Sequence, residues 1–257
     1  MSFQKFIECW NDTKHTCQIN KNFAPKSIKY SHNNNLVIPP CIHTTNISIV
    51  NQDTLEAGID LVSNNRYPLV LNLADNNFPG GHVDMGSGAQ EESIFRRTNY
   101  FTTLNYTSSP RLYPILDTEA IYSPSIMVIK NGNLEYTNRT YLMSFVACPG
   151  IKHPELVDGH LSTTDKERLF IKIETVFQIA LHNNHDSLVL GALGCGAWNN
   201  PPEDVIEIYK DVIKKWDGVF KTIVFAILEI DNKDYIVKNK SMFRKSNWHI
   251  FNENLHA

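Results

Sequence analysis

Two short apolar runs, each followed directly by a glycine-rich loop, do most to limit how this chain can fold. Residues Tyr67–Leu73 form one nearly continuous apolar segment, and Leu188–Leu193 forms the other. Such runs are typical of strands that are covered on both faces of a sheet. Segments with helical periodicity alternate with the predicted strands. The pattern predicts an α/β fold, a three-layer α/β/α sandwich around a mixed, largely parallel sheet.

The remaining elements are predicted from the same two periodicities. The further strands are Ile47–Val50, Ser125–Lys130, Thr140–Ala147 and Thr222–Leu228, and the helices are Thr54–Asn65, Gln90–Asn99, Asp165–Asn183 and Pro202–Trp216. We interpret residues 1–45 as an N-terminal extension with a short helix, packed on a main domain of residues 46–257. The extension is too short to bury a core of its own.

Composition excludes several classes of function. The 257 residues carry a net charge of −3, so no overall basic field is available to bind nucleic acid. The five cysteines are scattered and lack a CxxC pair, which indicates free thiols in a reducing compartment. Neither a secretory signal nor an apolar run of about 20 residues, the length of a membrane span, is evident. We expect a soluble monomer, located in the cytoplasm or the nucleus.

The loop after the first apolar run contains groups suited to a sugar phosphate. Asp75 and Asn76 stand where a ribose hydroxyl could be held. Gly80 and Gly81 let backbone amides approach an anion, because no Cβ stands in the way. An ordinary turn with proline and glycine is the alternative interpretation.

The second loop, residues 191–201, begins within the second apolar run. It has glycines at alternating positions and precedes a helix. Its exposed amides and the helix dipole favour an anion. Trp198 could cover a sugar, or it could fill the core of a tight turn. The two loops together suggest a bent diphosphate held from two sides. Neither loop matches a Walker or a dinucleotide-binding motif.

Two adjacent carboxylates, Glu91 and Glu92, follow the first loop at the start of a predicted helix. In isolation they could simply complement the helix dipole. Beside a phosphate-binding loop they suggest acid–base work on a glycosidic bond, because burial, like charge and a bound diphosphate raise a carboxyl pKa. Cys195, between two glycines, is either a thiol nucleophile or a small residue in a tight turn. The histidines lack metal-ligand spacing, so we expect no metal and no cofactor.

These motifs resemble the signature of the microbial-type poly(ADP-ribose) glycohydrolases, a branch of the macrodomain fold. The resemblance joins Val70–Ala74, Pro79–Gly81 and Gln90–Ser93 with the second loop, Leu190–Pro201. Shorter similar stretches are Arg96–Asn99, Ile121–Pro124 and Val146–Pro149. The resemblance implies a hydrolase that releases ADP-ribose from ADP-ribosylated acceptors.

The resemblance also implies roles for individual residues. Glu92 would be the catalytic acid/base, and Glu91 would hold ribose hydroxyls. Asn76, or Asp75 in a competing alignment, would be a further ribose contact. The other expected substrate contacts are Gly80, Gly81, His82, Asp84, Gln90, Gly194, Cys195, Gly196, Ala197 and Trp198.

His82 departs from the family pattern, because three consecutive glycines are usual and the third position here is a histidine. Together with Asp84, it could reshape the acceptor side and favour single ADP-ribose units, for example on arginine. A mono-ADP-ribosyl hydrolase with little activity on polymer is therefore one alternative. A module that binds ADP-ribose without turnover is the other.

Overall fold

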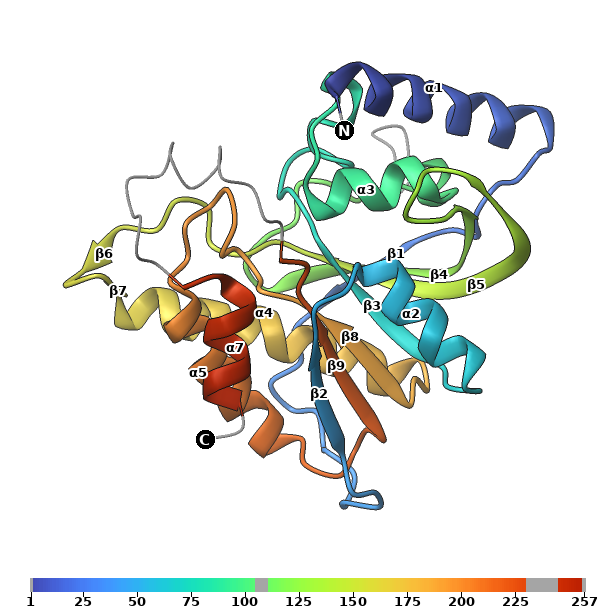
Figure 1. Ribbon diagram of the computed structural model, residues 1–257. Helices are drawn as coiled ribbons and strands as arrows, with labels where there is room; N and C mark the ends of the chain where they lie inside the picture. The colour runs from blue at the N-terminus through green and yellow to red at the C-terminus, as the bar shows by residue number, and fades with distance from the viewer. Residues whose placement is uncertain (1, 105–110, 230–244, 256–257) are drawn as a thin grey trace.

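The protein folds into one mixed sheet with helices on both faces (Figure 1). The computed structural model describes residues 2–104, 111–229 and 245–255. Its helices are α1 (Phe3–Ile19), α2 (Thr54–Ser63), α3 (Gln90–Arg97), α4 (Thr163–His182), α5 (Pro202–Lys215) and α7 (Asn247–Leu255), with 3-10 turns η1 (Val83–Met85) and η2 (Tyr100–Thr102). Its strands are β1 (Ile28–Ser31), β2 (Asn46–Val50), β3 (Pro68–Leu73), β4 (Glu119–Lys130), β5 (Tyr136–Cys148), β6 (Leu156–Val157), β7 (His160–Leu161), β8 (Ser187–Leu190) and β9 (Thr222–Ala226).

The seven-stranded sheet has the order β1-β4-β5-β3-β8-β9-β2. The neighbours from β5 through β2 all pair in parallel, whereas β4 runs antiparallel to both β1 and β5. A separate short hairpin joins β6 to β7. The predicted mixed, largely parallel sheet is therefore confirmed.

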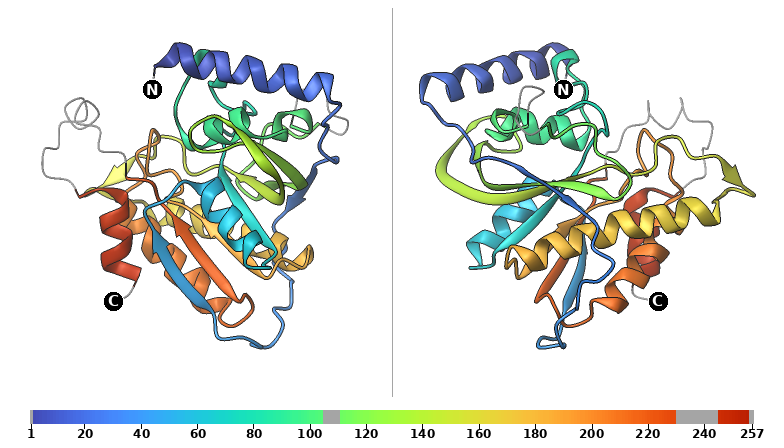
Figure 2. Two further views of the ribbon diagram at one scale, coloured as in Figure 1. Left: turned by 45° about the vertical axis from the view of Figure 1, so that its right-hand side comes forward. Right: turned by 180° about the vertical axis from the view of Figure 1, so that it is seen from behind.

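The central strand β3 contributes side chains to two hydrophobic cores, one on each face of the sheet. Leu69 and Leu71 belong to the core that contains the buried faces of α4 and α5. Val70 points the other way, into the core beneath α2 and α3. Alternate side chains of a strand point to opposite faces, so an apolar run covered on both sides produces this arrangement. The two further views show α4 and α2 on opposite faces (Figure 2), which confirms the three layers.

The N-terminal segment is more closely integrated than an external extension. Residues of β1 pair with β4 at one edge of the main sheet, in the register Ile28↔Tyr122. Helix α1 lies across α3 (Figure 1), where the Trp10 indole N–H donates to Asp84 at 2.7 Å. The guanidinium of Arg96, on α3, stacks over the ring of Phe6, on α1. The boundary after residue 45 stays a prediction. Within the described residues, no helix is both long and apolar enough to cross a bilayer.

Candidate functional site

The two glycine loops lie at the same edge of the sheet. They follow β3 and β8, which are neighbours in the sheet and run parallel, with Leu69 opposite Leu188. Ligands of open α/β sheets bind at the carboxyl ends of the strands. The two loops that the sequence singled out are therefore both placed where a shared ligand would be bound.

Glu91 ties the first loop to helix α3. Its Oε2 accepts from the backbone N–H of Asp75 at 2.7 Å, and its Oε1 accepts from the backbone N–H of Gly80 at 3.1 Å. The amide of Asn72, near the carboxyl end of β3, donates to the same Oε1 at 3.2 Å. Glu91 is only 4% exposed. The carboxyl group of Glu91 thus connects two positions of the loop, Asp75 and Gly80, to the end of β3.

Burial raises the pKa of Glu91 to about 8, from an ordinary value of 4.5. The three hydrogen bonds lower this pKa because they favour the ionised form, while the nearby Glu92 raises it. The effect of burial on the pKa is larger than the effect of the hydrogen bonds, so Glu91 retains its proton near neutral pH in the folded protein.

This raised pKa predicts how stability depends on pH. Between about pH 4.5 and 8 the folded protein keeps the Glu91 proton, whereas the unfolded chain releases it. The stability contributed by Glu91 is therefore complete below pH 4.5 and is lost as the pH rises through about 8. Urea unfolding at a series of pH values should show this loss for the native protein and not for Glu91→Gln. The exposed control Glu203→Gln should follow the native profile. Parallel profiles for all three would contradict the assignment.

Glu92 differs from Glu91 in having one oxygen available. Its Oε1 accepts from the backbone N–H of His82 at 3.1 Å. Its Oε2 is buried, and among the described residues it has no hydrogen-bond partner. The residue is 6% exposed, so this oxygen is removed from bulk solvent. A buried polar atom without a partner is costly unless a ligand or a water satisfies it. Glu92 is therefore the carboxyl group of the pair that is available for a substrate.

Gly80 and Gly81 of the first loop lie so close to side chains of α3 that neither position has room for a Cβ atom. Gly80 has φ +80°, and a Cβ there would lie 2.5 Å from the Phe95 ring. Gly81 has φ +55°, and a Cβ there would lie 2.6 Å from Oε1 of Glu92. Both the left-handed backbone and the contacts exclude larger residues. Gly81 thus lies directly against the candidate acid.

The Gln90 side chain forms hydrogen bonds to the backbone of β3. The Gln90 carboxamide accepts from the N–H of Leu73 at 2.8 Å and donates to the carbonyl of Leu71 at 2.8 Å, so it fixes the start of α3 to β3. Its predicted role as a substrate contact stays a prediction. Asn72 was not predicted from the sequence. A carboxamide next to the end of an otherwise apolar strand was the available signal.

The side chains of Asp75 and Asn76 have different neighbours. One carboxylate oxygen of Asp75 accepts from the N–H groups of Asn77 and Phe78 and closes the turn. Its other oxygen lies 3.5 Å from Nζ of Lys152. The Asn76 side chain lines a pocket beside the loop. Both residues lie at the predicted edge of the site, and their ribose contacts stay predictions.

His82 and Asp84 lie on the outer side of the loop. His82 is exposed, and its backbone, not its ring, contacts Glu92. Asp84 accepts from Trp10 and lies 3.4 Å from Nζ of Lys14, so its carboxylate binds helix α1. The structure therefore brings Asp84 to the N-terminal helix, and not to the two glutamates.

Asn200, a residue not predicted from the sequence, organises the second loop. Its amide donates to the carbonyls of Ile151 and Gly194, and its oxygen accepts from the N–H of Ile151. Gly194 has φ +76°, and a Cβ there would lie 2.7 Å from the Asn200 side chain. Asn200 thus holds the loop after β8 against the segment that follows β5.

The remaining residues of the second loop separate into buried and accessible ones. Cys195 is 8% exposed, and its Sγ donates to the carbonyl of Leu193. Gly196 and Ala197 are exposed and Trp198 is half-buried. Nζ of Lys152 lies 5.6 Å from the centre of the Trp198 ring. Lys152 therefore contacts a residue of each glycine loop.

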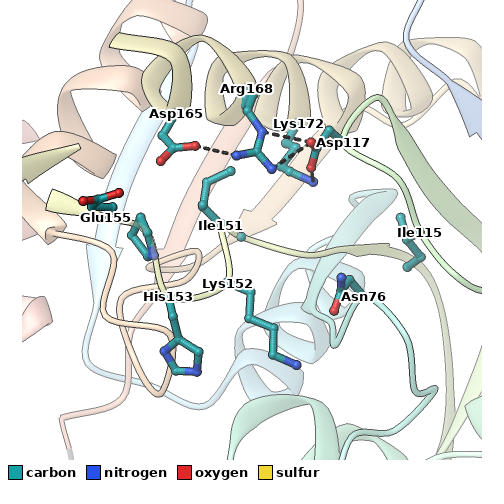
Figure 3. Close-up of a pocket in the computed structure, with 12 residues that line it drawn as sticks. Asn76, Ile115, Asp117, Ile151, Lys152, His153, Glu155, Asp165, Arg168 and Lys172 are labelled. Atoms are coloured by element: carbon teal, nitrogen blue, oxygen red, sulfur yellow. Dashed lines mark hydrogen bonds and ion pairs between the residues drawn. The ribbon is translucent and has the colours of Figure 1, made fainter. Parts of the chain in front are cut away.

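A polar pocket of about 250 Å³ opens beside the first loop (Figure 3). Its wall is an ion-pair network in which Asp117 binds both Arg168 and Lys172 of α4. Burial raises the pKa of Asp117, but these two cations outweigh it and hold the pKa below 3.8. Lys152 and Asn76 face the same space from the opposite side (Figure 3). In the part of the chain that the structure describes, no group of three or more His, Cys, Asp or Glu side chains could hold a metal ion.

Comparison with known proteins agrees with this arrangement. Residues 6–131 match the family model described as "Microbial-type PARG, catalytic domain". The resemblance predicted from the sequence is thus confirmed over the part of the chain that contains both glutamates. None of the curated proteins matches the chain.

Solved structures share this fold over most of the chain. The poly(ADP-ribose) glycohydrolase of Thermomonospora curvata aligns with a TM-score of 0.79 at 19% identity and covers 97% of this chain and 99% of its own. The same enzyme bound to the inhibitor ADP-HPD aligns at 0.75 and 20% identity, with the same coverage. The Deinococcus radiodurans enzyme in complex with ADP-ribose aligns at 0.70 and 20% identity, covering 84% and 86%. At these identities the structures show a shared fold.

Proposed function

We propose that this protein hydrolyses the glycosidic bond that joins ADP-ribose to its acceptor, as a poly(ADP-ribose) glycohydrolase. The observation that carries the proposal is the buried, unpartnered Oε2 of Glu92, next to Gly81. The match of residues 6–131 to the family model of the microbial-type PARG catalytic domain supports the same activity. So does the fold shared with glycohydrolases solved with ADP-ribose and ADP-HPD.

In this proposal Glu92 acts twice. Protonated Glu92 gives its proton to the leaving oxygen as the bond to the anomeric carbon breaks, and an oxocarbenium-like ribosyl centre forms. The ionised Glu92 then removes a proton from water, which attacks that centre and releases ADP-ribose. General acid–base help of this kind is worth roughly 10²–10⁴-fold in rate. Positioning by the two loops would supply the remainder.

Glu91 has a limited capacity to bind substrate. Its Oε1 already accepts two hydrogen bonds, whereas its Oε2 accepts one, from Asp75. A carboxyl oxygen has two lone-pair positions, so one remains on Oε2; in the protonated carboxyl group it carries the proton and can donate. We assign that position to a ribose hydroxyl. In the second loop, the exposed backbone of Gly196 and Ala197 and the ring of Trp198 would surround the diphosphate and the ribose beyond it.

A comparison of substrates tests the proposal. Release of free ADP-ribose would be measured from ADP-ribose polymer, from a protein modified on arginine and from one modified on aspartate or glutamate. Release from polymer supports the proposed function. Release from the modified proteins alone favours the mono-ADP-ribosyl hydrolase. Binding of ADP-ribose with no release from any substrate would contradict the enzymatic proposal and indicate a reader module. Among the described residues the cysteines form no disulfide, which supports an intracellular location.

His82 offers a separate test of the acceptor side. Its ring is exposed on the loop that holds Glu92, and its backbone φ of −107° needs no glycine. If the ring narrows the acceptor side, His82→Gly should raise the rate of release from polymer. His82→Ala should do the same and, with less added backbone freedom, controls for flexibility. Unchanged rates in both variants would show that the ring does not restrict access.

A further inference from the structure

The polar pocket beside the first loop lies on the β5 side of the proposed site. Strand β3 has β8 on one side and β5 on the other. The proposed ADP-ribose site spans the loops of β3 and β8. The pocket instead combines Asn76, from the loop of β3, with residues 150–155, which follow β5. Asn76 adjoins Asp75, whose N–H donates to Glu91. The pocket therefore borders the two glutamates on the β5 side of the first loop, which is left for the leaving group when ADP-ribose occupies the two loops. Its Lys152 also lies 5.6 Å from the centre of the Trp198 ring, in the second loop.

The pocket wall is fixed and charge-balanced. Asp117 and Asp165 together pair with Arg168, and Asp117 also pairs with Lys172. Lys172 is 2% exposed, so removing Asp117 would leave its charge buried and unpaired. These four side chains are paired with one another.

The mouth of the pocket, by contrast, has basic groups that a ligand could engage. The side chain of Lys152 is 44% exposed, and its distance of 3.5 Å to Asp75 is long for an ion pair. His153 is exposed beside it, with φ +49°, and the Asn76 carboxamide lines the same space. Glu155 is the opposing charge at this mouth. An ammonium, an imidazole and an amide together suit a phosphate group.

We infer that Lys152, His153 and Asn76 form a subsite for a phosphate of the leaving ADP-ribose unit, so that polymer is preferred over a single unit on protein. The inference depends on the proposed function. A volume of about 250 Å³ is below the roughly 300–1,000 Å³ typical of sites for larger ligands. The subsite thus has room for a ribose phosphate and not for a whole nucleotide.

Kinetics on two substrates test this inference. For each variant, kcat/KM would be measured on polymer and on a mono-ADP-ribosylated protein, and the ratio of the two compared with that of the native protein. Lys152→Ala should lower the ratio about five-fold, mainly through KM on polymer, with a smaller effect in high salt. Lys152→Arg should retain most of the ratio. Glu155→Gln should raise it, because a repulsive charge is removed.

The exposed Lys214→Ala, on α5, is the matched control and should leave the ratio unchanged. An unchanged ratio in Lys152→Ala overturns the inference, because the lysine then does not distinguish the substrates. A native protein that releases ADP-ribose from modified protein but not from polymer also overturns it, while leaving ADP-ribosyl hydrolysis intact. A native protein that acts on neither substrate contradicts the proposed function itself.

Discussion

Replacing Glu92 with glutamine should lower the rate of ADP-ribose release by about 10²–10⁴-fold and leave ADP-ribose binding within a few-fold. Glutamine has the shape of glutamate, and its carbonyl oxygen can still accept from the N–H of His82 at the position of Oε1. The amide that replaces the unpartnered Oε2 cannot supply a proton to a leaving group. The chemical step is lost while the loop geometry is retained. Release of free ADP-ribose and calorimetric binding of ADP-ribose measure the two effects separately.

Glu203→Gln provides the matched control for this variant. Glu203 lies in the first turn of α5 and is exposed, so the same chemical change there should leave release unchanged. Thermal unfolding of both variants would show whether folding is affected. Native rates of release from Glu92→Gln would eliminate the proposed role of this residue. Loss of binding together with release would indicate that Glu92 binds the ligand and does not act as the acid.

Strand β3 and its loop were predictable because their signals are local. An unbroken apolar run marks a strand buried on both faces, and glycines mark the turn where the backbone approaches Glu92. Strand β5 shows the limit of this reasoning. Its second half is buried, but its first half, from Tyr136, is largely exposed and lacks an apolar pattern. The predicted strand therefore began at Thr140, four residues late.

The connections between distant segments could not be predicted. The bonds of Asn200 to Ile151 join residues 49 positions apart, and nothing near either residue indicates the partner. The same is true of Lys152, which reaches Asp75 only after β5 has been placed beside β3. Strand β1 has four residues at the edge of the sheet, too few for a periodic signal. The bond between Asp84 and Trp10 of α1 was likewise not indicated by the sequence near either residue, and the role of Asp84 as a substrate contact stays a prediction.

Gly81→Ala should lower the rate of ADP-ribose release at least ten-fold and destabilise the fold by about 1–2 kcal/mol, the usual cost of a side chain in the left-handed region. The added methyl would lie 2.6 Å from Oε1 of Glu92, closer than van der Waals contact permits. The carboxyl group is the mobile partner in this clash, so it must move. Its hydrogen bond from His82 would then lengthen. The release rate and urea unfolding measure the two losses.

Gly132→Ala separates this effect from the general cost of replacing glycine. A Cβ at Gly132 would lie 3.5 Å from Oε1 of Glu56, an ordinary contact, and the residue is exposed in the turn between β4 and β5. That variant should release ADP-ribose at the native rate. A native kcat in Gly81→Ala would show that the carboxyl of Glu92 can shift without consequence, which is incompatible with a role at the reacting centre. Because the methyl displaces Glu92 without altering its chemistry, an inactive but folded Gly81→Ala would show that the position of this carboxyl group, as well as its identity, is required.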